Sequence, residues 1–360
     1  LAAPLAGTVD RGRDDLAGLL YTSGTTGPAK GAMITHGNLS SNARALLGAW
    51  AFEPGDVLIH GLPLFHVHGL YVALNTAFLN GSPLIWLPRF DAPALVGLLA
   101  QATLFMGVPT HYTRLLAEPG LDSRACRAMR LFVSGSAPLL PETHVAFRER
   151  TGHAILERYG MTETGMIASN PYRGDRRPGT VGFALPGIAV RIADADGREP
   201  PRGEPGVIEV KGPNVCRGYW RKPERTAEDF RGDGYFITGD VGVMDGEGRV
   251  AILGRTRDLI ITGGLNVYPR EVEAALDALP GVVESAVVGV PHPDFGEGVV
   301  AAVVAGEGPV DEAAIIAALA ESLAGFKLPK RVFRVADLPR NAMGKVEKAK
   351  LRERFADTFR

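Results

Sequence analysis

The chain has 360 residues, of which 46% are hydrophobic and 22% are charged, and its formal net charge is −1. This length allows two or three domains, and the near-zero charge gives no basic surface for binding nucleic acid. No apolar run approaches the ~20 residues needed to span a bilayer. The two cysteines, Cys126 and Cys216, have no metal-ligand spacing and suit a reducing compartment, so we expect a cytoplasmic protein.

The first half of the chain predicts strands that alternate with helices. Residues 16–21 and 31–35 are expected strands on either side of the stretch YTSGTTGPAKGA. The alternation that follows indicates an α/β domain with a largely parallel sheet. Further strands are expected at 57–64, 83–87, 103–108, 130–134 and 154–158, and helices at 38–50, 92–101, 109–117 and up to about 151.

The second half changes character at Gly179. Short apolar runs at 190–192, 207–210 and 250–253 are separated by Gly, Pro and Asp turns, which predicts a β-rich subdomain. The last ~100 residues predict a small α/β domain of their own. Its helices are expected at 269–279 and 311–323, its strands at 282–290, 299–305 and 332–335, and a basic tail follows at 345–354.

The stretch at residues 21–32 predicts a phosphate-binding loop. Glycines let a loop bring its backbone N–H groups close to a ligand, and hydroxyls and a lysine then contact phosphate oxygens. It is not the Walker pattern, because Ala29 precedes the lysine and Gly31 follows it. A surface turn is the alternative interpretation. The polar residues are Ser23, Thr25, Thr26 and Lys30.

Three polar clusters follow predicted strands, at residues 23–30, 134–137 and 159–163. In open α/β sheets, ligands bind beyond the carboxyl ends of the strands. We therefore expect these clusters to form one site.

Five strings occur in order along the chain: SGTTGPAKG, YGMTET, YFITGD, GRTRDLIITGG and PRNAMGKV. With these strings the chain resembles the adenylate-forming acyl-CoA synthetase superfamily. LPLFHVHGL, ERYGMTET and GGLNVYPREVE look most like malonyl-CoA synthetases. The resemblance implies an adenylation domain over residues 1–256, beginning near the phosphate loop and lacking its N-terminal part. It also implies a small mobile α+β domain over residues 257–360, with a hinge near Arg257.

The implied reaction uses ATP, Mg²⁺ and coenzyme A. A carboxylate attacks the α-phosphorus of ATP, and the thiol of coenzyme A then displaces AMP. The small domain is expected to rotate between these two steps, so that Lys345 leaves and the loop at residues 263–265 enters.

The resemblance assigns each site residue a role. The catalytic residues implied are Lys345, Thr162, Glu163 and His66, with Glu163 as the Mg²⁺ ligand. Arg257, Gly263, Gly264 and Leu265 belong to the hinge and the thiol tunnel. The nucleotide residues implied are Thr22, Ser23, Gly24, Thr25, Thr26, Gly27, Lys30, Gly135, Ser136, Ala137, Arg158, Tyr159, Gly160, Met161, Thr162, Asp240 and Arg255.

Each of these residues also has an ordinary structural interpretation. Glu163 fits a charge at a helix N-terminus, and Asp240 fits a turn. Lys345 fits a solvated charge in a basic tail, and Gly263-Gly264 fits a simple hairpin turn.

The acyl pocket is expected to contain His68, Arg114 and Ser136. His66 and His68 would share a face if the segment were extended, and buried, hydrogen-bonded histidines are the alternative. Arg114 would point away from the apolar face of a helix, as a solvated arginine. The resemblance instead makes Arg114 the ligand of the distal carboxylate of malonate, since a planar guanidinium suits bidentate capture. Methylmalonate is a second expected substrate.

Other functions remain open from the sequence. The chain could be a fatty-acyl or aryl-acid ligase, or a stand-alone adenylation domain that loads a carrier protein. A third alternative is a truncated nucleotide-binding fragment with little activity, whose exposed sheet edges would favour aggregation.

Overall fold

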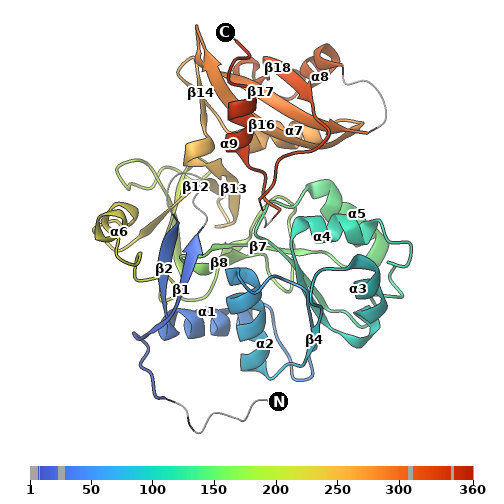
Figure 1. Ribbon diagram of the computed structural model, residues 1–360, viewed down its shortest axis with the longest axis vertical. Coiled ribbons are helices and arrows are strands. Elements are labelled where there is room, and N and C mark those ends of the chain that lie inside the picture. Colours follow the sequence, from blue (N-terminus) through green and yellow to red (C-terminus); the bar gives the residue numbers. More distant parts are fainter. Residues whose placement is uncertain (1–6, 8, 23–28, 307–310, 342–343, 360) are drawn as a thin grey trace. The chain divides into compact units, whose positions relative to one another are not determined.

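A computed structural model describes residues 7, 9–22, 29–306, 311–341 and 344–359 of the chain. These residues fold into helices and mixed sheets (Figure 1). The chain divides into two compact units. The first comprises Leu1–Arg191, Glu209–Ile237 and Gly248–Val250, and the second comprises Ile192–Ile208, Thr238–Glu247 and Ala251–Arg360.

The first unit is built on a seven-stranded sheet with the order β4-β3-β5-β6-β7-β8-β9. Neighbours from β4 to β7 are parallel, and β7-β8 and β8-β9 are antiparallel. The predicted α/β class is therefore confirmed, with a mixed sheet. The strands are β3 (Leu58–His60), β4 (Leu84–Trp86), β5 (Leu104–Gly107), β6 (Leu131–Ser134), β7 (Leu156–Met161), β8 (Gly165–Ser169) and β9 (Phe183–Ala184).

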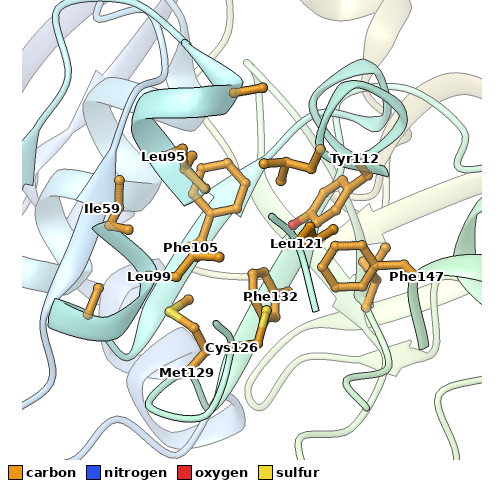
Figure 2. Close-up of a cluster of buried hydrophobic side chains, with 14 of the residues drawn as sticks. Ile59, Leu95, Leu99, Phe105, Tyr112, Leu121, Cys126, Met129, Phe132 and Phe147 are labelled. Carbon is orange, nitrogen blue, oxygen red and sulfur yellow. The ribbon is translucent and has the colours of Figure 1, made fainter. Parts of the chain in front are cut away.

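Helices pack on this sheet through a cluster of buried aromatic and aliphatic side chains (Figure 2). Phe132 meets Phe147 edge-on with ring centroids 4.9 Å apart, and the phenol of Tyr112 donates a 2.7 Å hydrogen bond to the Val133 carbonyl. Each such buried ring contributes roughly 1.5–3 kcal/mol of hydrophobic stabilisation. The helical segments in this cluster are α3 (Ala92–Leu98), η2 (Leu99–Gln101), α4 (Pro109–Leu116) and α5 (Pro141–Thr151). The first unit also contains η1 (His68–Ala73, a π-helix), α2 (Leu74–Asn80) and α6 (Pro223–Asp229).

Helix α1 (His36–Ala49) begins at a reciprocal cap. Thr35 accepts a side-chain hydrogen bond from the Asn38 N–H, and the Asn38 side chain accepts one from the Thr35 N–H. One turn later, the Asn42 amide bonds both backbone groups of Met166 in β8. The helix therefore holds the β7-β8 hairpin in place.

Two smaller sheets complete the region before residue 256. Strands β1 (Leu16–Thr22) and β2 (Lys30–Thr35) form an antiparallel pair in which Thr22 lies opposite Lys30. The β-rich region expected after Gly179 is a sheet of order β10-β11-β12-β13. Its strands are β10 (Ala189–Ala193), β11 (Gly206–Lys211), β12 (Phe236–Met244) and β13 (Val250–Arg255).

The second unit carries a sheet of order β15-β14-β17-β16, with β18 parallel to β17. Alternate residues of β16 and β17 face opposite ways: Val287 packs toward α7 and α8, and Val288 packs toward α9. This period of two is what a sheet covered on both faces requires. The elements are η3 (Thr256–Asp258), β14 (Ile260–Thr262), β15 (Leu265–Val267), α7 (Pro269–Asp277), β16 (Val282–His292), β17 (Gly296–Ala305), α8 (Glu312–Leu319), η4 (Gly325–Lys327), β18 (Arg331–Arg334) and α9 (Lys348–Arg354).

Candidate functional site

The phosphate-loop stretch connects the two strands of the β1-β2 pair. Its residues Ser23, Gly24, Thr25, Thr26 and Gly27 lie outside the described residues. Lys30 begins β2, and its ammonium lies 3.6 Å from the Asp229 carboxylate and 4.6 Å from the ring centroid of Tyr219. A cation over an aromatic face gains electrostatic stabilisation, so the side chain of Lys30 is held at a fixed place.

Glu163 lies in the turn between β7 and β8, which excludes the interpretation of a charge at a helix N-terminus. Its carboxylate is buried and accepts a 3.0 Å hydrogen bond from the phenol of Tyr219. Burial raises the pKa of Glu163, while the Tyr219 hydrogen bond and the charge of Lys30 oppose that rise. Tyr219 thus touches both Lys30 and Glu163.

Tyr219 belongs to a segment that is hydrogen-bonded both to β2 and to the turn between β7 and β8. The Trp220 N–H bonds the Gly31 carbonyl in β2, and the Cys216 N–H bonds the Glu163 carbonyl. Sequence reasoning missed Tyr219 because nothing in its local pattern distinguishes it from an ordinary core tyrosine.

The fit of Mg²⁺ depends on Glu163. Among the described residues, no group of three or more His, Cys, Asp or Glu side chains could hold a metal ion. Mg²⁺ is usually bound through one or two carboxylates together with substrate phosphates and waters. A single buried carboxylate beside the end of the phosphate loop is compatible with that mode.

The end of β6 forms a tight corner at residues 134–137. Gly135 is buried, Ser136 and Ala137 are half-buried, and Ser136 has a left-handed backbone with φ 72°. A Cβ at Gly135 would lie 2.4 Å from Cζ of Arg158. Only glycine therefore lets the guanidinium pass at this point.

Arg158 is a buried arginine in β7 whose guanidinium makes few hydrogen bonds with the described residues. The residue is 3% exposed, and its Nε and Nη2 atoms have no hydrogen-bond partner among the described residues. Burial lowers the pKa of Arg158 to about 9. A buried cation without an anion is costly, so this position is suited to a negatively charged ligand.

Other buried side-chain polar atoms also have no hydrogen-bond partner in the part of the chain that the structure describes. His68 is within electrostatic reach of Arg158, His111 and His60. Burial lowers the pKa of His68 and, together with the charge of Arg114, that of His111 to about 4. These histidines are therefore neutral at pH 7. We call the following five residues the buried polar cluster: His60, His68, His111, Ser134 and Arg158.

The histidine segment is not extended, because His68 begins the π-helix η1. The Nδ1 atom of His66 accepts a 3.1 Å hydrogen bond from the His68 N–H, and Nδ1 of His68 lies 3.3 Å from the Ser136 hydroxyl. His68 and Ser136, which sequence reasoning placed in one pocket, are thus in contact.

The positions of the remaining predicted site residues of the first unit are set by strand β7, the turn after it and helix α4. Strand β7 runs on to Met161, three residues beyond the predicted end, so Tyr159 and Gly160 lie within it, and Thr162 follows in the turn. The Tyr159 ring is buried. Arg114 is exposed on α4, opposite the buried Tyr112 and Leu115, as the helical pattern predicts.

In the second unit, the Asp240 carboxylate pairs with Nε of Arg255 at 3.1 Å. Thr256 donates a hydrogen bond to the Gly239 carbonyl at 3.2 Å, which ties the start of η3 to strand β12, in which Asp240 lies. Burial lowers the pKa of Arg257, and the neighbouring Arg255 contributes to this shift. Asp240 and Arg255, both expected among the nucleotide residues, are therefore in direct contact.

The other two predicted features of the second unit are loops. Gly263 and Gly264, with φ 56° and 79°, form the two-residue turn between β14 and β15, a geometry that favours glycine at both positions. Lys345 follows a second turn that contains Gly344, and its N–H bonds the Asn341 side chain at 3.1 Å.

Comparisons with known proteins agree with these features. Residues 5–220 match the AMP-binding enzyme family, and residues 271–345 match the AMP-binding enzyme C-terminal domain. A malonate–CoA ligase of Arabidopsis thaliana is 39% identical over 94% of this chain, and a feruloyl-CoA synthase of an Amycolatopsis species is 39% identical over 96%. The chain spans 61% of the length of the first relative and 71% of the second.

Among solved structures, ATP-bound MatB from Rhodopseudomonas palustris is 58% identical, with a TM-score of 0.96 over 98% of this chain and 71% of that one. No helix in the described part of the chain has the length and apolar character to cross a membrane. The matches cover both units, and the chain belongs to the family of AMP-binding enzymes.

Proposed function

We propose that this chain activates a small dicarboxylic acid, malonate, with ATP and transfers the acyl group to coenzyme A. In the first step a carboxylate oxygen attacks the α-phosphorus of ATP and pyrophosphate leaves. In the second step the thiol attacks the acyl carbonyl and AMP leaves. Methylmalonate, with one additional methyl group, is the second substrate that the proposal includes.

The observation that carries the malonate assignment is the buried guanidinium of Arg158, with two nitrogen atoms that lack partners among the described residues. A ligand with a second carboxylate would neutralise this cation and accept its N–H groups. Charge-assisted hydrogen bonds of this kind are roughly twice as strong as neutral ones. A fatty or aryl acid has no group for this position.

The neighbours of Arg158 support a role on the acyl side rather than on the phosphate side of the proposed site. Its guanidinium lies against Gly135 and acts electrostatically on His68. Glu163 responds instead to the charges of Lys30 and Asp229. We therefore assign Arg158 to the acyl pocket, together with His68 and Ser136, and no longer to the nucleotide residues. Arg114 stays a second candidate for the distal carboxylate.

The remaining roles follow the family resemblance. Lys30 and the phosphate loop hold the β- and γ-phosphates, and Tyr159, Asp240 and Arg255 hold the adenosine. Glu163 would hold Mg²⁺, which supplies charge neutralisation to the phosphates when bound. Lys345 stabilises the charge that develops on the α-phosphate during adenylation. The turn at Gly263-Gly264 forms part of the tunnel through which the thiol of coenzyme A enters. Arg257 is the hinge about which the small domain rotates.

The proposal sets this reaction in a reducing compartment such as the cytoplasm, since Cys126 and Cys216 are both buried free thiols. Binding of a carrier protein in place of coenzyme A is the alternative for the second step.

The test is AMP formation with malonate, methylmalonate, octanoate and ferulate, each with and without coenzyme A. We expect malonyl-CoA and AMP in equal amounts, with malonate preferred. Faster turnover of octanoate or ferulate would exclude malonate as the substrate. Adenylation without release of free acyl-CoA would favour the carrier-loading alternative, and absence of both steps would favour a nucleotide-binding fragment.

A further inference from the structure

Lys345 follows a turn whose described ends are joined by two main-chain hydrogen bonds. The Gly344 N–H bonds the Asn341 carbonyl at 2.9 Å, and the Asn341 N–H bonds the Lys345 carbonyl at 3.0 Å. Arg340 and Val346 lie opposite each other across the turn as an isolated β-bridge. Residues 342 and 343 lie outside the described residues. The backbone that carries Lys345 is therefore fixed on both sides of the turn.

The peptide group between Gly344 and Lys345 is held at both of its polar atoms. Nη1 of Arg340 donates a 2.7 Å hydrogen bond to the Gly344 carbonyl, and the Lys345 N–H donates a 3.1 Å bond to the Asn341 side chain. Because a peptide group is planar, these two bonds set the direction in which the chain leaves Gly344. They therefore set where the Lys345 side chain begins.

Arg340 is itself anchored to the sheet. Its Nη2 atom contacts both carboxylate oxygens of Glu284, a residue of β16 that lies opposite Val304 in β17. The Arg340 and Glu284 side chains are 26% and 32% exposed. The planar guanidinium can hold a carboxylate and a carbonyl at once, which an ammonium cannot do with the same geometry. We call Arg340 and Glu284 the clamp, and it connects the Lys345 turn to β16, which pairs with β17.

We infer that Arg340, anchored by Glu284, is a positioning residue that holds Lys345 for the adenylation step. This inference rests on the role proposed above for Lys345. A lysine side chain has large rotational freedom, so its backbone must be fixed if the ammonium is to reach the α-phosphate. Misplacement of a catalytic group by about 1 Å can cost 100-fold in rate.

The matched control is the ion pair between Arg331 in β18 and Glu312 in α8. Nε of Arg331 lies 3.0 Å from the Glu312 carboxylate, and Glu312 also accepts a bond from the Val332 N–H. This pair likewise joins an arginine to a glutamate within the second unit, but it makes no hydrogen bond or ion pair with the described residues of the turn at 340–346. Arg331→Ala therefore removes a comparable ion pair without touching Lys345.

The experiment separates the two half-reactions. Malonate-dependent ATP–pyrophosphate exchange reports adenylation, and conversion of a chemically prepared acyl-adenylate to the thioester reports the second step. We expect Arg340→Ala to slow adenylation by about 10- to 100-fold and to leave thioester formation within about twofold. Arg340→Lys should lie between Arg340→Ala and the unaltered chain, and Arg331→Ala should leave both steps within about twofold.

Hydrogen exchange gives a readout that does not depend on turnover. Arg340→Ala and Glu284→Gln should each speed exchange of the amides of Gly344 and Lys345, and Arg331→Ala should not. The inference is overturned if Arg340→Ala slows both half-reactions equally, or neither, or leaves these amides as protected as before. Lys345→Ala separates the two claims: retained adenylation in this variant refutes the role of Lys345, whereas lost adenylation with a normal Arg340→Ala refutes the clamp alone.

Discussion

The phenol of Tyr219 donates a 3.0 Å hydrogen bond to the Glu163 carboxylate, and the ammonium of Lys30 lies over the ring of the same tyrosine. The side chain of Tyr219 thus joins Lys30 and Glu163, which are far apart in the sequence. Tyr219 and Glu163 are both buried, so the hydrogen bond between them is shielded from bulk water.

Tyr219→Phe removes the hydrogen bond and keeps the ring under Lys30. A hydrogen bond to a charged group contributes about 1.5–3 kcal/mol, so the free energy of unfolding should fall by about that amount. If Glu163 holds Mg²⁺, the Mg²⁺ concentration for half-maximal adenylation should also rise. Chemical denaturation and Mg²⁺ titration measure the two effects. Tyr235→Phe, which keeps the ring that stacks on the Arg191 guanidinium, is the control and should change neither.

Gly264→Ala tests the assignment of the β14-β15 turn to the thiol. An alanine with φ near 79° is strained by about 1–2 kcal/mol, and the strain should displace the turn. We expect slower thioester formation from an acyl-adenylate and unchanged ATP–pyrophosphate exchange.

Gly281→Ala is the matched control for this turn, because Gly281 also has a left-handed backbone, φ 85°, and no described atom within 4 Å of where a Cβ would lie. Both variants should lose similar stability, and only Gly264→Ala should slow the thiol step. Equal rates of thioester formation in the two variants would remove the turn from the thiol path.

Asp277 in α7 should make the stability of the second unit depend on pH. Burial raises the pKa of Asp277 to about 6 from 3.8; the Ser285 hydroxyl opposes the rise, the charges of Glu273 and Glu284 add to it, and Arg270 opposes it. Because the folded state binds this proton more tightly than the unfolded state, the contribution of Asp277 to stability is lost as pH rises from about 4 to about 6.

Asp277→Asn removes that loss. We expect an increase in the free energy of unfolding at pH 7.5 of at most about 3 kcal/mol, and a much smaller increase at pH 4.5. Thermal or urea unfolding at the two pH values measures it. Glu321→Gln, an exposed change in the same unit, should give no such difference. An equal gain for Asp277→Asn at both pH values would contradict the assignment.

Arg114→Ala tests the arginine that the sequence resemblance assigned to malonate. Arg114 is exposed, and charge interactions at exposed positions are worth about 0.2–1 kcal/mol because water and salt screen them. We expect the KM for malonate to rise by a few-fold at most, and that for acetate to stay unchanged. A loss of several hundred-fold for malonate would make Arg114, rather than Arg158, the principal ligand of the distal carboxylate.

The sequence predicted the fold better than it predicted the contacts of the site. Apolar periodicity located β5, β6 and α4 to within a residue or two, because those elements bury a continuous face. It missed the π-helix that begins at His68, since a short apolar run between turns does not distinguish a strand from a helix. Motif strings named Glu163 and Lys345, whose local patterns are distinctive.

The supporting residues could not be predicted, because their function depends on tertiary contacts. Nothing near Tyr219 indicates that it reaches Glu163, and nothing near Glu284 indicates that it anchors Arg340. Arg158 lies in a named motif, yet only the structure shows that its guanidinium is buried without an anionic partner among the described residues. Long-range pairing of this kind leaves no period in the sequence.

Arg158→Gln tests most directly whether the Arg158 guanidinium binds the distal carboxylate of malonate. Removing one partner of a buried charge pair costs about 2–5 kcal/mol, so malonate should lose roughly 30-fold or more in adenylation efficiency while acetate is nearly unaffected. Arg176→Gln is the control, since Arg176 is also a largely buried arginine but donates to the carbonyls of Ala154, Pro171 and Tyr172. It should lower stability and leave the malonate-to-acetate ratio unchanged.

The most direct test of the central claim is therefore the ratio of malonate- to acetate-dependent ATP–pyrophosphate exchange, measured for the unaltered chain and for Arg158→Gln. We expect the unaltered chain to prefer malonate strongly, and we expect this preference to be lost in Arg158→Gln and kept in Arg176→Gln. Exchange that favours acetate, octanoate or ferulate over malonate, or a malonate preference that Arg158→Gln leaves intact, would contradict it.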